Sequence, residues 1–365
     1  MTDEAYMKRA LRLARRGLGK TSPNPMVGAV IVKGSRIIGE GYHRNYGGSH
    51  AEINALQSAG EDVSGATIYV TLEPCCHYGK TPPCVEAIIR NRLERVVIGT
   101  LDPNPLVNGK SIELLNRQGI ETRVGVLAED CRELNEAYFK QITTGTPLVT
   151  LKFAQTLDGR IATAAGSSQW ISSDSFRKLA HKLRAASDAI MLGIDTVLVD
   201  NPELTVRLAK GRNPVRVVLD TRLRITPGAR VMSELEKAPT IIVTASRDEE
   251  KISRLRGLGV EVLTAPEYDA GGIDLENLLG VLGRRGISSV LVEGGAGVIT
   301  SMLRHNLADR LVVAVAPKIM GRGIEAVGEL NICEVSRTLN LSFRKIYRAG
   351  EDIVIEAGFG SAADA

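Results

Sequence analysis

The chain of 365 residues carries 46 Lys and Arg against 42 Asp and Glu, and 44% of its residues are hydrophobic. This composition is typical of a folded globular protein and excludes a disordered or collagen-like chain. The length favours two domains, because single cores stop growing near ~250–300 residues. The net charge of +4 and the lack of a dense basic run argue against nucleic acid as a partner. No apolar stretch approaches the ~18 uncharged residues of a membrane-spanning helix.

The first residues and the cysteines bear on the cellular compartment. Residues 1–16 alternate charged and apolar side chains and lack the apolar core of a signal peptide. The five cysteines are odd in number, and three of them lie in one short segment, which favours metal binding or reactive thiols in a reducing compartment. We therefore expect a cytoplasmic protein.

Helices and strands are predicted to alternate through the first part of the chain. A helix over residues 3–16 precedes a β-hairpin over residues 28–42, turned at Lys33-Gly34-Ser35. Further helices are predicted at residues 50–59, 83–91, 110–118 and 128–142, and strands at residues 67–71, 95–99 and 121–124. This alternation predicts βαβ crossovers and a largely parallel sheet with helices on its faces.

A second α/β series begins after a short polar stretch. Residues 143–147 are predicted to be a linker, because they are polar and close with a proline that cannot continue a helix. Strands are then predicted at residues 148–154, 189–193, 215–219, 240–244, 260–264, 289–293 and 310–316, and helices at residues 175–184, 250–258, 275–284 and 298–305. We therefore expect two α/β domains, residues 1–145 and 146–365.

The segment His50-Ala51-Glu52, with Cys75 and Cys84 downstream, predicts a catalytic zinc site. A zinc enzyme needs three protein ligands and one open position, which a histidine and two thiolates provide. Glu52 is not needed as a ligand. Beside the metal it can carry protons for the activated water, as in the H-x-E…P-C-x-x-C deaminases.

The spacing of the cysteines departs from that pattern, because eight residues separate Cys75 from Cys84. Cys76 is an alternative ligand, but Cys75 is preferred because it directly follows the proline. A purely structural zinc is the other alternative. Cys131 and Cys333 have no comparable neighbours and are expected to be core residues.

Several segments resemble the deaminase half of the bifunctional riboflavin-biosynthesis deaminase/reductase family. They are PNPMVGAVIV (23–32), GEGYH (39–43), HAE (50–52), TLEPCCHYGKTPPC (71–84) and DPNP (102–105). The long cysteine spacing is typical of this branch of the deaminases. The resemblance implies a cytidine-deaminase-like three-layer α/β/α domain that hydrolyses the 2-amino group of 2,5-diamino-6-ribosylamino-4(3H)-pyrimidinone 5′-phosphate.

Four residues near the zinc motif are candidates for binding that substrate. Asn24 lies in a stiff Pro-Asn-Pro loop and can hydrogen-bond a pyrimidine. His43, His77 and Lys80 are candidates for the ribose phosphate, which needs cationic or N–H donors. The alternative is that these are solvated loop residues.

The second half holds no cluster of metal ligands, so a cofactor is expected there. Residues 293–297, Glu-Gly-Gly-Ala-Gly, lie between a predicted strand and a predicted helix, where glycines let a phosphate approach the helix N-terminus. A tight strand–helix turn is the alternative interpretation.

The second half resembles the reductase half of the same family through LKFAQTLDGRIA (151–162), GSSQWIS (166–172), LGIDTVLVDNPELTVR (192–207), VEGG (292–295) and APKIMG (316–321). That half is similar to dihydrofolate reductase and uses NADPH to reduce the ribosyl group of 5-amino-6-(5-phosphoribosylamino)uracil. The resemblance implies these contacts to the dinucleotide: Ala154, Trp170, Thr196, Asp200, Gly295, Ala296, Gly297, Val298, Ile299, Thr300 and Ser301. It implies these substrate contacts: Ser168, Arg184, Leu204, Arg207 and Glu293.

Five charged residues of this half can also be interpreted from their own chemistry. Lys152 and Glu293 are candidates for proton transfer or for binding the sugar hydroxyls, and Arg184 and Arg207 suit a 5′-phosphate. Asp158 lies in a Leu-Asp-Gly-Arg turn and is interpreted as structural.

The loop after the strand at residues 215–219 is predicted to bind the 2′-phosphate of NADPH. Thr221 offers a hydroxyl and Arg222 a fork of donors, and Arg224 lies on the same loop. Asp220 is expected to turn away and cap the loop. A plain surface turn is the alternative.

We expect one zinc ion per chain, NADPH, phosphorylated pyrimidine substrates, no nucleic-acid or membrane partner, and a homo-oligomer. A monofunctional zinc deaminase of nucleosides or bases with a non-catalytic C-terminal domain is the alternative function. A nucleic-acid-editing module is a further alternative, against which the near-neutral charge argues.

Overall fold

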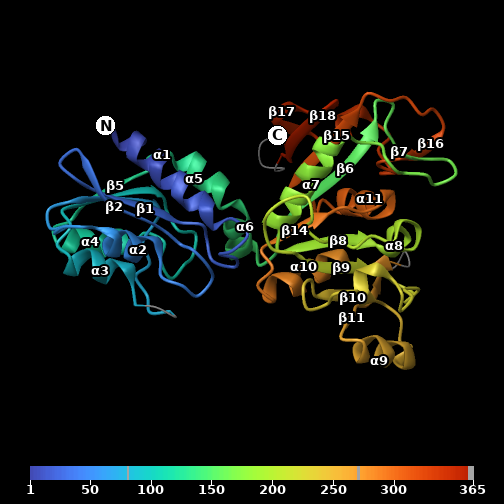
Figure 1. The fold of residues 1–365 in the computed structure, drawn as a ribbon, viewed down its shortest axis with the longest axis horizontal. Coiled ribbons are helices and arrows are strands. Elements are labelled where there is room, and N and C mark those ends of the chain that lie inside the picture. The colour runs from blue at the N-terminus through green and yellow to red at the C-terminus, as the bar shows by residue number, and fades with distance from the viewer. Residues whose placement is uncertain (80–81, 269–271, 361–365) are drawn as a thin grey trace. The chain divides into compact units, whose positions relative to one another are not determined.

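The computed structural model describes residues 1–79, 82–268 and 272–360. The chain divides into two compact units, Met1–Thr146 and Pro147–Ala365. Each unit is built around its own sheet, with helices packed on both faces (Figure 1). Within the described ranges, every helix is too short or too polar to cross a membrane.

The sheet of the first unit has five strands in the order β2-β1-β3-β4-β5. Its strands are β1 (Gly28–Lys33), β2 (Arg36–Tyr42), β3 (Thr67–Leu72), β4 (Arg95–Thr100) and β5 (Glu121–Val124). β1 is antiparallel to both of its neighbours, whereas β3, β4 and β5 are parallel. The hairpin at one edge and the crossovers at the other follow the predicted pattern.

Helices cover both faces of this sheet and give it three layers (Figure 1). The helices are α1 (Asp3–Ala14, followed by a 3₁₀ turn at Arg15–Gly17), α2 (Ala51–Ser58), α3 (Cys84–Arg90), α4 (Lys110–Arg117), α5 (Ala128–Leu134) and α6 (Glu136–Thr144). Successive strand residues point to opposite faces. Ile31 and Ile68 therefore pack with residues of α2, α3 and α4, while Val30 and Tyr69 pack with α1 and α5.

The single helix predicted over residues 128–142 is wrong, because the chain breaks at Asn135 into α5 and α6. Asn135 is buried, and its side chain accepts a hydrogen bond from the Met26 amide (2.7 Å) and donates one to the Met26 carbonyl (2.9 Å). The predicted linker is also too long. Thr143 and Thr144 belong to α6, which ends at Gly145 in the left-handed region (φ 74°).

The sheet of the second unit has nine strands in the order β11-β10-β9-β8-β14-β6-β15-β18-β17. They are β6 (Leu148–Thr156), β8 (Ala189–Gly193), β9 (Val215–Leu219), β10 (Thr240–Thr244), β11 (Glu261–Thr264), β14 (Ser289–Val292), β15 (Arg310–Ala316), β17 (Leu341–Ala349) and β18 (Asp352–Phe359). The strands from β11 to β15 are parallel, and the hairpin β17–β18 continues the sheet antiparallel to β15.

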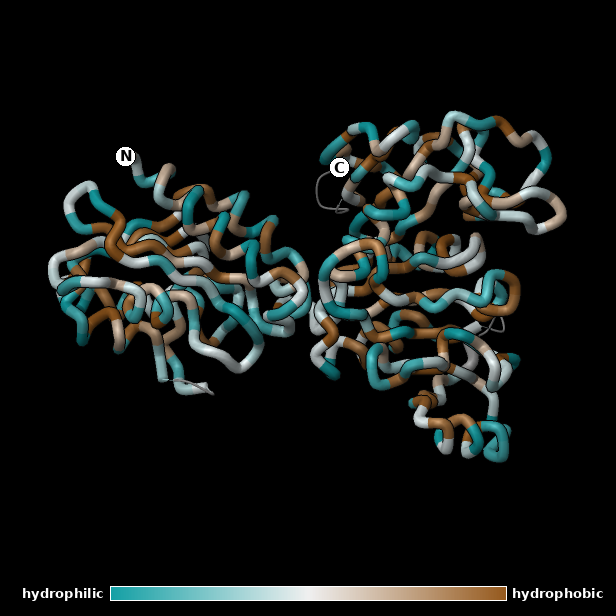
Figure 2. Tube along the Cα trace, in the orientation of Figure 1, coloured by the Kyte–Doolittle hydropathy of each residue, from teal (hydrophilic) through white to brown (hydrophobic). Residues whose placement is uncertain are grey.

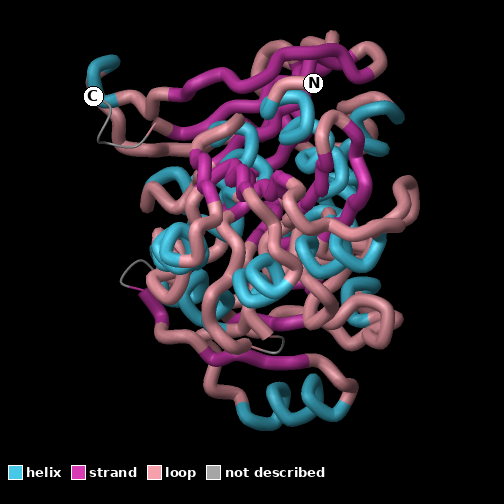
Figure 3. Tube along the Cα trace, turned by 90° about the vertical axis from the view of Figure 1, so that its left-hand side faces the viewer, coloured by secondary structure: helices cyan, strands magenta, loops and turns pink. Residues whose placement is uncertain are grey.

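Helices cover both faces of the second sheet as well. They are α7 (Asp174–Ala186), α8 (Ile194–Asp200), α9 (Glu249–Gly257), α10 (Leu275–Arg284) and α11 (Ala296–Arg304). Residues of α10 and α11 pack on one face, and residues of α8 and α9 pack on the other, together with α7 over β15 and β18. In Figure 2, hydrophobic colour appears along strands of both units and on parts of the helices that cover them. α9 lies at one end of the unit beside β11 (Figures 1 and 3).

Short elements complete the second unit. They are the two-stranded ribbon β7 (Arg160–Thr163) with β16 (Gly323–Glu325), the pair β12 (Glu267–Tyr268) with β13 (Gly272–Ile273), and the 3₁₀ turns Arg230–Met232 and Val335–Arg337. The predictions from sequence omitted these elements, α8 and the hairpin β17–β18. The predicted architecture is confirmed at this level: a three-layer α/β domain precedes a second α/β domain.

Candidate metal centre and candidate cofactor pocket

His50, Cys75 and Cys84 come together where three segments of the first unit meet. His50 is the residue before α2, Cys75 follows β3, and Cys84 begins α3. Nδ1 of His50 lies 3.5 Å from Sγ of Cys75 and 3.3 Å from Sγ of Cys84. The three ligand atoms all lie within 4.8 Å of one another.

This geometry suits a tetrahedral zinc ion. Bonds of ~2.0 Å to nitrogen and ~2.3 Å to sulfur place the two ligand atoms about 3.5 Å apart. Cys76 lies outside the group, because its Sγ faces the carbonyl oxygen of Leu106 at 3.5 Å. Of the two adjacent thiols, the structure therefore brings Cys75 to the ligand set.

Hydrogen bonds within the cluster shift the pKa values of the two thiols in opposite directions. The hydrogen bond from the Cys84 thiol, opposed by burial, lowers the pKa of Cys75, and the amide of Cys84 donates a further bond to its Sγ (3.3 Å). The same bond to Cys75 raises the pKa of Cys84. Cys75 is thus held as the thiolate that a metal ion requires.

Glu52 lies in the first turn of α2 and its residue is only 3% exposed. Burial and the nearby Cys75 thiolate raise the pKa of this carboxyl to about 7, against the opposing effect of His50. The carboxyl lies against the thiol of Cys84, so it faces the metal ligands. A buried carboxyl beside an open metal position can accept and return protons.

Glu73 fixes the loop that carries Cys75, and sequence analysis missed it. Its buried carboxylate accepts hydrogen bonds from the amides of Asp102 (3.3 Å), Gly109 (3.0 Å) and Ser111 (3.3 Å). The hydroxyl of Ser111 donates to the carbonyl of Pro74 (2.5 Å). The acidic residue of the Glu-Pro-Cys segment was the available signal.

Asn24 and His43 are neighbours beside the metal centre. Nε2 of His43 lies 3.3 Å from Nδ2 of Asn24, and its Nδ1 donates to the carbonyl of Ser49 (3.1 Å). His43 is 2% exposed, and burial lowers its pKa. The prediction that His43 binds phosphate is therefore corrected: its ring is buried, neutral and already used to orient the amide of Asn24.

His77 and Lys80 are the other two candidates for binding the phosphate. His77 has a buried Nδ1 without a hydrogen-bond partner in the described part of the chain. Its ring lies close enough to Asp102 to influence the pKa of that carboxyl. Lys80 lies outside the described residues.

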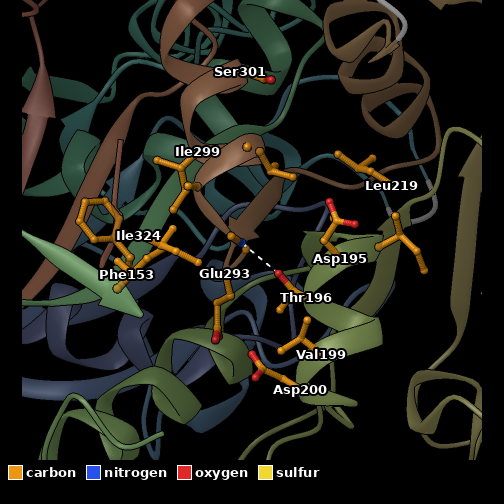
Figure 4. Close-up of a pocket in the computed structure, with 18 of the residues that line it drawn as sticks. Phe153, Asp195, Thr196, Val199, Asp200, Leu219, Glu293, Ile299, Ser301 and Ile324 are labelled. Carbon is orange, nitrogen blue, oxygen red and sulfur yellow. Dashed lines mark hydrogen bonds between the residues drawn. The ribbon is translucent and has the colours of Figure 1, made fainter. Parts of the chain in front are cut away.

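The second unit contains a cavity of about 980 Å³ (Figure 4). It opens beyond the carboxyl ends of β8, β9 and β14, where ligands of open α/β sheets bind. The wall includes these residues that the sequence predicted: Lys152, Ala154, Ser168, Thr196, Asp200, Thr221, Glu293, Gly295, Ala296, Gly297, Val298, Ile299 and Ser301.

The loop between β14 and α11 forms one side of this cavity. The Gly295 amide donates to Oγ1 of Thr196 (3.1 Å), the dashed line in Figure 4. A Cβ at Gly294 would lie 2.9 Å from the Leu192 Cα, so a larger residue would force β14 and β8 apart. The side chains of Glu293 and Asp200 point into the same part of the cavity (Figure 4).

Glu293 is held between two cations. Arg184 Nε and Nη2 donate to its two carboxylate oxygens at 2.7 and 2.8 Å, and Lys152 Nζ lies 3.4 Å away. Burial opposes ionisation, but the two cations prevail and lower the pKa of Glu293 to about 2. Arg184 also donates to the carbonyl of Thr205 (3.2 Å). Its fork is therefore occupied and does not face a phosphate, contrary to the prediction.

Other predicted residues lie outside the cavity wall. Leu204 is buried in the core with residues of β8 and β9, so its side chain does not reach a substrate. Thr300 is turned to the carbonyl of Ala296 and the amide of Gly328. Trp170 is 61% exposed, with the guanidinium of Arg177 4.1 Å from its ring centre. Arg207 is exposed and pairs with Glu203.

The loop after β9 reaches the cavity with Thr221, Arg222 and Arg224. Arg224 pairs with Asp195 at 2.7 Å. Asp220 is fully buried, and its carboxylate accepts the amide of Ile225 (2.7 Å). Its side chain is thus turned away from the cavity.

Two family models match the chain. Residues 1–100 match the cytidine and deoxycytidylate deaminase zinc-binding region, and residues 147–355 match the RibD C-terminal domain. The first match contains the histidine–cysteine cluster, and the second contains the cavity.

Relatives match along nearly the whole chain. The riboflavin biosynthesis protein RibD of Aquifex aeolicus is 48% identical over 354 residues, which cover 97% of this chain and 97% of that protein. RibD of Escherichia coli is 39% identical and covers 97% of this chain and 99% of that protein.

Solved structures agree with these matches. A diaminohydroxyphosphoribosylaminopyrimidine deaminase/5-amino-6-(5-phosphoribosylamino)uracil reductase from Thermotoga maritima has a TM-score of 0.87 at 41% identity, covering 98% of this chain and 99% of that one. RibD of Acinetobacter baumannii has a TM-score of 0.89 at 37% identity, with the same coverage.

Proposed function

The chain belongs to the RibD family of riboflavin-biosynthesis proteins, and we propose that its domains, residues 1–145 and 146–365, perform two consecutive reactions. The first is the hydrolytic deamination of 2,5-diamino-6-ribosylamino-4(3H)-pyrimidinone 5′-phosphate. The second is the NADPH-dependent reduction of 5-amino-6-(5-phosphoribosylamino)uracil to the ribitylamino product. The observation that carries this proposal is that one chain holds both the His50–Cys75–Cys84 cluster with Glu52 and the glycine-lined cavity.

In the deaminase domain, His50, Cys75 and Cys84 would hold one zinc ion per chain. When bound, zinc supplies a Lewis acid that makes water nucleophilic near neutral pH. Glu52 takes a proton from the attacking water and returns it to the departing ammonia. Its burial keeps bulk water from competing for that proton.

Asn24 would hydrogen-bond the pyrimidine, and His43 would fix the orientation of its amide. His77 and Lys80 would bind the ribose phosphate. The unpartnered Nδ1 of His77 supports its share in this role, because a buried polar atom without a partner is costly unless a ligand satisfies it.

In the reductase domain, the cavity would hold the dinucleotide and the sugar side by side. NADPH supplies the hydride that reduces C1′ of the ring-opened ribosyl group. Ala154, Thr196, Asp200 and the segment Gly295–Ser301 would contact the dinucleotide, with the N-terminus of α11 beside its phosphates. Trp170 would reach it from the loop at the edge of the cavity.

Lys152, Ser168 and Glu293 would bind the substrate's sugar. Glu293 accepts hydrogen bonds from hydroxyls, because Arg184 and Lys152 keep it ionised. Arg184 would act on the substrate through Glu293. Arg207 would bind the 5′-phosphate, and Leu204 would support the segment that carries Arg207.

The substrates are small phosphorylated pyrimidines, and we place the enzyme in the cytoplasm as a homo-oligomer. The described cysteines are all free, which suits a reducing compartment. The edge strand β17 exposes Phe343 (65%) and Ile346 (60%), which supports association through this face.

Mass spectrometry of the product tests the two activities together. With the diaminopyrimidine alone, we expect the mass change of an NH group exchanged for oxygen. Added NADPH should give a further gain of two hydrogen atoms. Deamination without any NADPH consumption would instead support a monofunctional deaminase.

A further inference from the structure

Two sequence motifs of the second unit are joined by hydrogen bonds, and the proposed function gives neither of them a role. They are Leu157–Arg160, between β6 and β7, and the segment after β15 that contains Lys318 and Gly321. The carboxylate of Asp158 accepts the hydroxyl of Thr156 (2.6 Å) and the amides of Met320 (3.1 Å) and Gly321 (2.7 Å). The amide of Leu157 donates to the carbonyl of Lys318 (2.8 Å).

Arg160 adds further contacts to the segment after β15. Its Nε donates to the Gly321 carbonyl (2.9 Å), and its guanidinium pairs with Glu325 at 2.6 Å. Gly321 has a φ of 75°, a conformation that favours glycine. The segment that carries Lys318 is therefore fixed by hydrogen bonds to the turn between β6 and β7.

From this turn, the Lys318 side chain reaches the loop of residues 164–173, which joins β7 to α7. Nζ donates to the carbonyl oxygens of Trp170 (2.7 Å) and Ile171 (2.8 Å). Within the described part of the chain, Lys318 pairs with no carboxylate. Its ammonium group is thus used to bind this loop rather than to balance a charge.

The loop of residues 164–173 is also part of the cavity wall. Gly166 and Ser168 line the cavity, and the hydroxyl of Ser168 donates to Asp200 at the end of α8 (3.2 Å). At its far end, Ser173 binds Asp352 through its amide and its hydroxyl, each at 2.8 Å. Between these two attachments, Lys318 holds the stretch that carries Trp170.

We propose that Lys318 is a positioning residue that fixes the loop of residues 164–173 at the cavity, so that Ser168 and Trp170 meet the ligands in one arrangement. The inference rests on the proposed reductase function. Asp158 and Arg160 act one step further away, because they hold the turn from which Lys318 extends.

Trp170 is the only tryptophan in the chain, so its fluorescence reports on this loop directly. Lys318→Met removes the ammonium group and keeps most of the alkyl chain. We expect lower anisotropy and stronger acrylamide quenching of Trp170 in the ligand-free protein. Lys318→Arg should restore much of both signals. The matched control is Lys251→Met, since Lys251 is an exposed lysine of α9, the helix beside β11 at the opposite edge of the sheet from β17.

Kinetics provide the second measurement. Two charge-assisted hydrogen bonds are lost, so the KM values for NADPH and for the deaminated substrate should rise roughly tenfold in Lys318→Met. The melting temperature should stay near that of Lys251→Met, whereas a merely structural role would lower it and leave the KM values unchanged. Asp158→Asn should act in the same direction, and adding Lys318→Met to it should have little further effect.

Unchanged Trp170 anisotropy and unchanged KM values in Lys318→Met would overturn the proposal. Failure of the proposed function looks different: wild-type protein would then not oxidise NADPH with the deaminated substrate. In that case the fluorescence comparison still decides whether Lys318 holds the loop.

Discussion

Arg184 and Glu293 form a two-pronged ion pair, Nε to Oε1 at 2.7 Å and Nη2 to Oε2 at 2.8 Å, at the wall of the cavity. The pair joins the last turn of α7 to the residue that follows β14. Both side chains are largely buried, at 13% and 7% exposure, so neither charge is well compensated by water. Glu293 is consequently an ionised acceptor at neutral pH and not a proton donor.

Replacing Glu293 with Gln should destabilise the reductase unit. Removing one partner leaves the buried Arg184 charge without its counter-ion, a loss of about 3 kcal/mol in the free energy of unfolding. Chemical denaturation followed by Trp170 fluorescence measures it. Glu261→Gln is the control, because the Glu261–Arg285 pair is exposed and worth about 1 kcal/mol or less. Equal losses in the two variants would contradict the buried-pair argument.

The same pair predicts a pH dependence. The pKa of Glu293 falls from an ordinary 4.5 to about 2 in the folded protein. Its ionisation therefore stabilises the fold fully above about pH 5, and this contribution is lost as the pH falls through 4.5 toward 2. The stability difference between wild type and Glu293→Gln should be constant from pH 6 to 8 and shrink at pH 3.5. A difference independent of pH would mean that Glu293 is not ionised in the folded state.

Zinc content should follow the three ligand atoms found together. We expect about one zinc per chain in the wild type by elemental analysis. Serine at Cys75 or Cys84, or alanine at His50, should remove most of it. Cys76→Ser is the matched control and should retain zinc, because its Sγ faces Leu106. Loss of zinc in Cys76→Ser with retention in Cys75→Ser would reverse the choice between the adjacent thiols.

The two activities should separate in Glu52→Gln. The amide keeps the shape of the side chain but cannot carry protons, so deamination should fall ~10²–10⁴-fold. Reduction of pre-deaminated substrate should stay at the wild-type rate, because the two units have separate cores. Zinc content should also be unchanged, which separates lost proton transfer from lost metal. Near-normal deamination would assign the proton carrier to another residue.

Local sequence patterns predicted the fold well where neighbouring residues decide it. β-branched runs such as Thr240–Thr244 identify buried parallel strands, and the hairpin β1–β2 follows from its Lys-Gly-Ser turn. The ligand motifs were also visible, because each lies at the end of a helix or strand.

Features that depend on distant partners were not predictable in this way. The break at Asn135 depends on Met26, 109 positions away, and the engagement of Arg184 depends on Glu293, also 109 positions away. The edge strand β17 mixes exposed charged and apolar residues, so it lacks the apolar run of a buried strand. The resemblance predicts Leu204 as a substrate contact, but the fold buries it beside β8 and β9.

Selectivity for NADPH over NADH is the remaining prediction. Thr221 and Arg222 line the cavity beyond β9, and Asp220 is turned into the loop, where it accepts the amide of Ile225. An acidic side chain facing the ribose would favour the free 2′-hydroxyl of NADH. Because Asp220 is turned away, the Thr221 hydroxyl and the Arg222 guanidinium can bind a 2′-phosphate.

The double variant Thr221→Ala/Arg222→Ala should therefore raise the KM for NADPH about tenfold, with little change in that for NADH. Arg224→Ala is the matched control, because Arg224 is already paired with Asp195 and its loss should affect NADPH less. Initial rates with each dinucleotide at saturating deaminated substrate give both constants. Equal effects on the two dinucleotides would place the 2′-phosphate site elsewhere in the cavity. A larger effect from Arg224→Ala would indicate that Arg224 binds the 2′-phosphate, after its ion pair with Asp195 breaks.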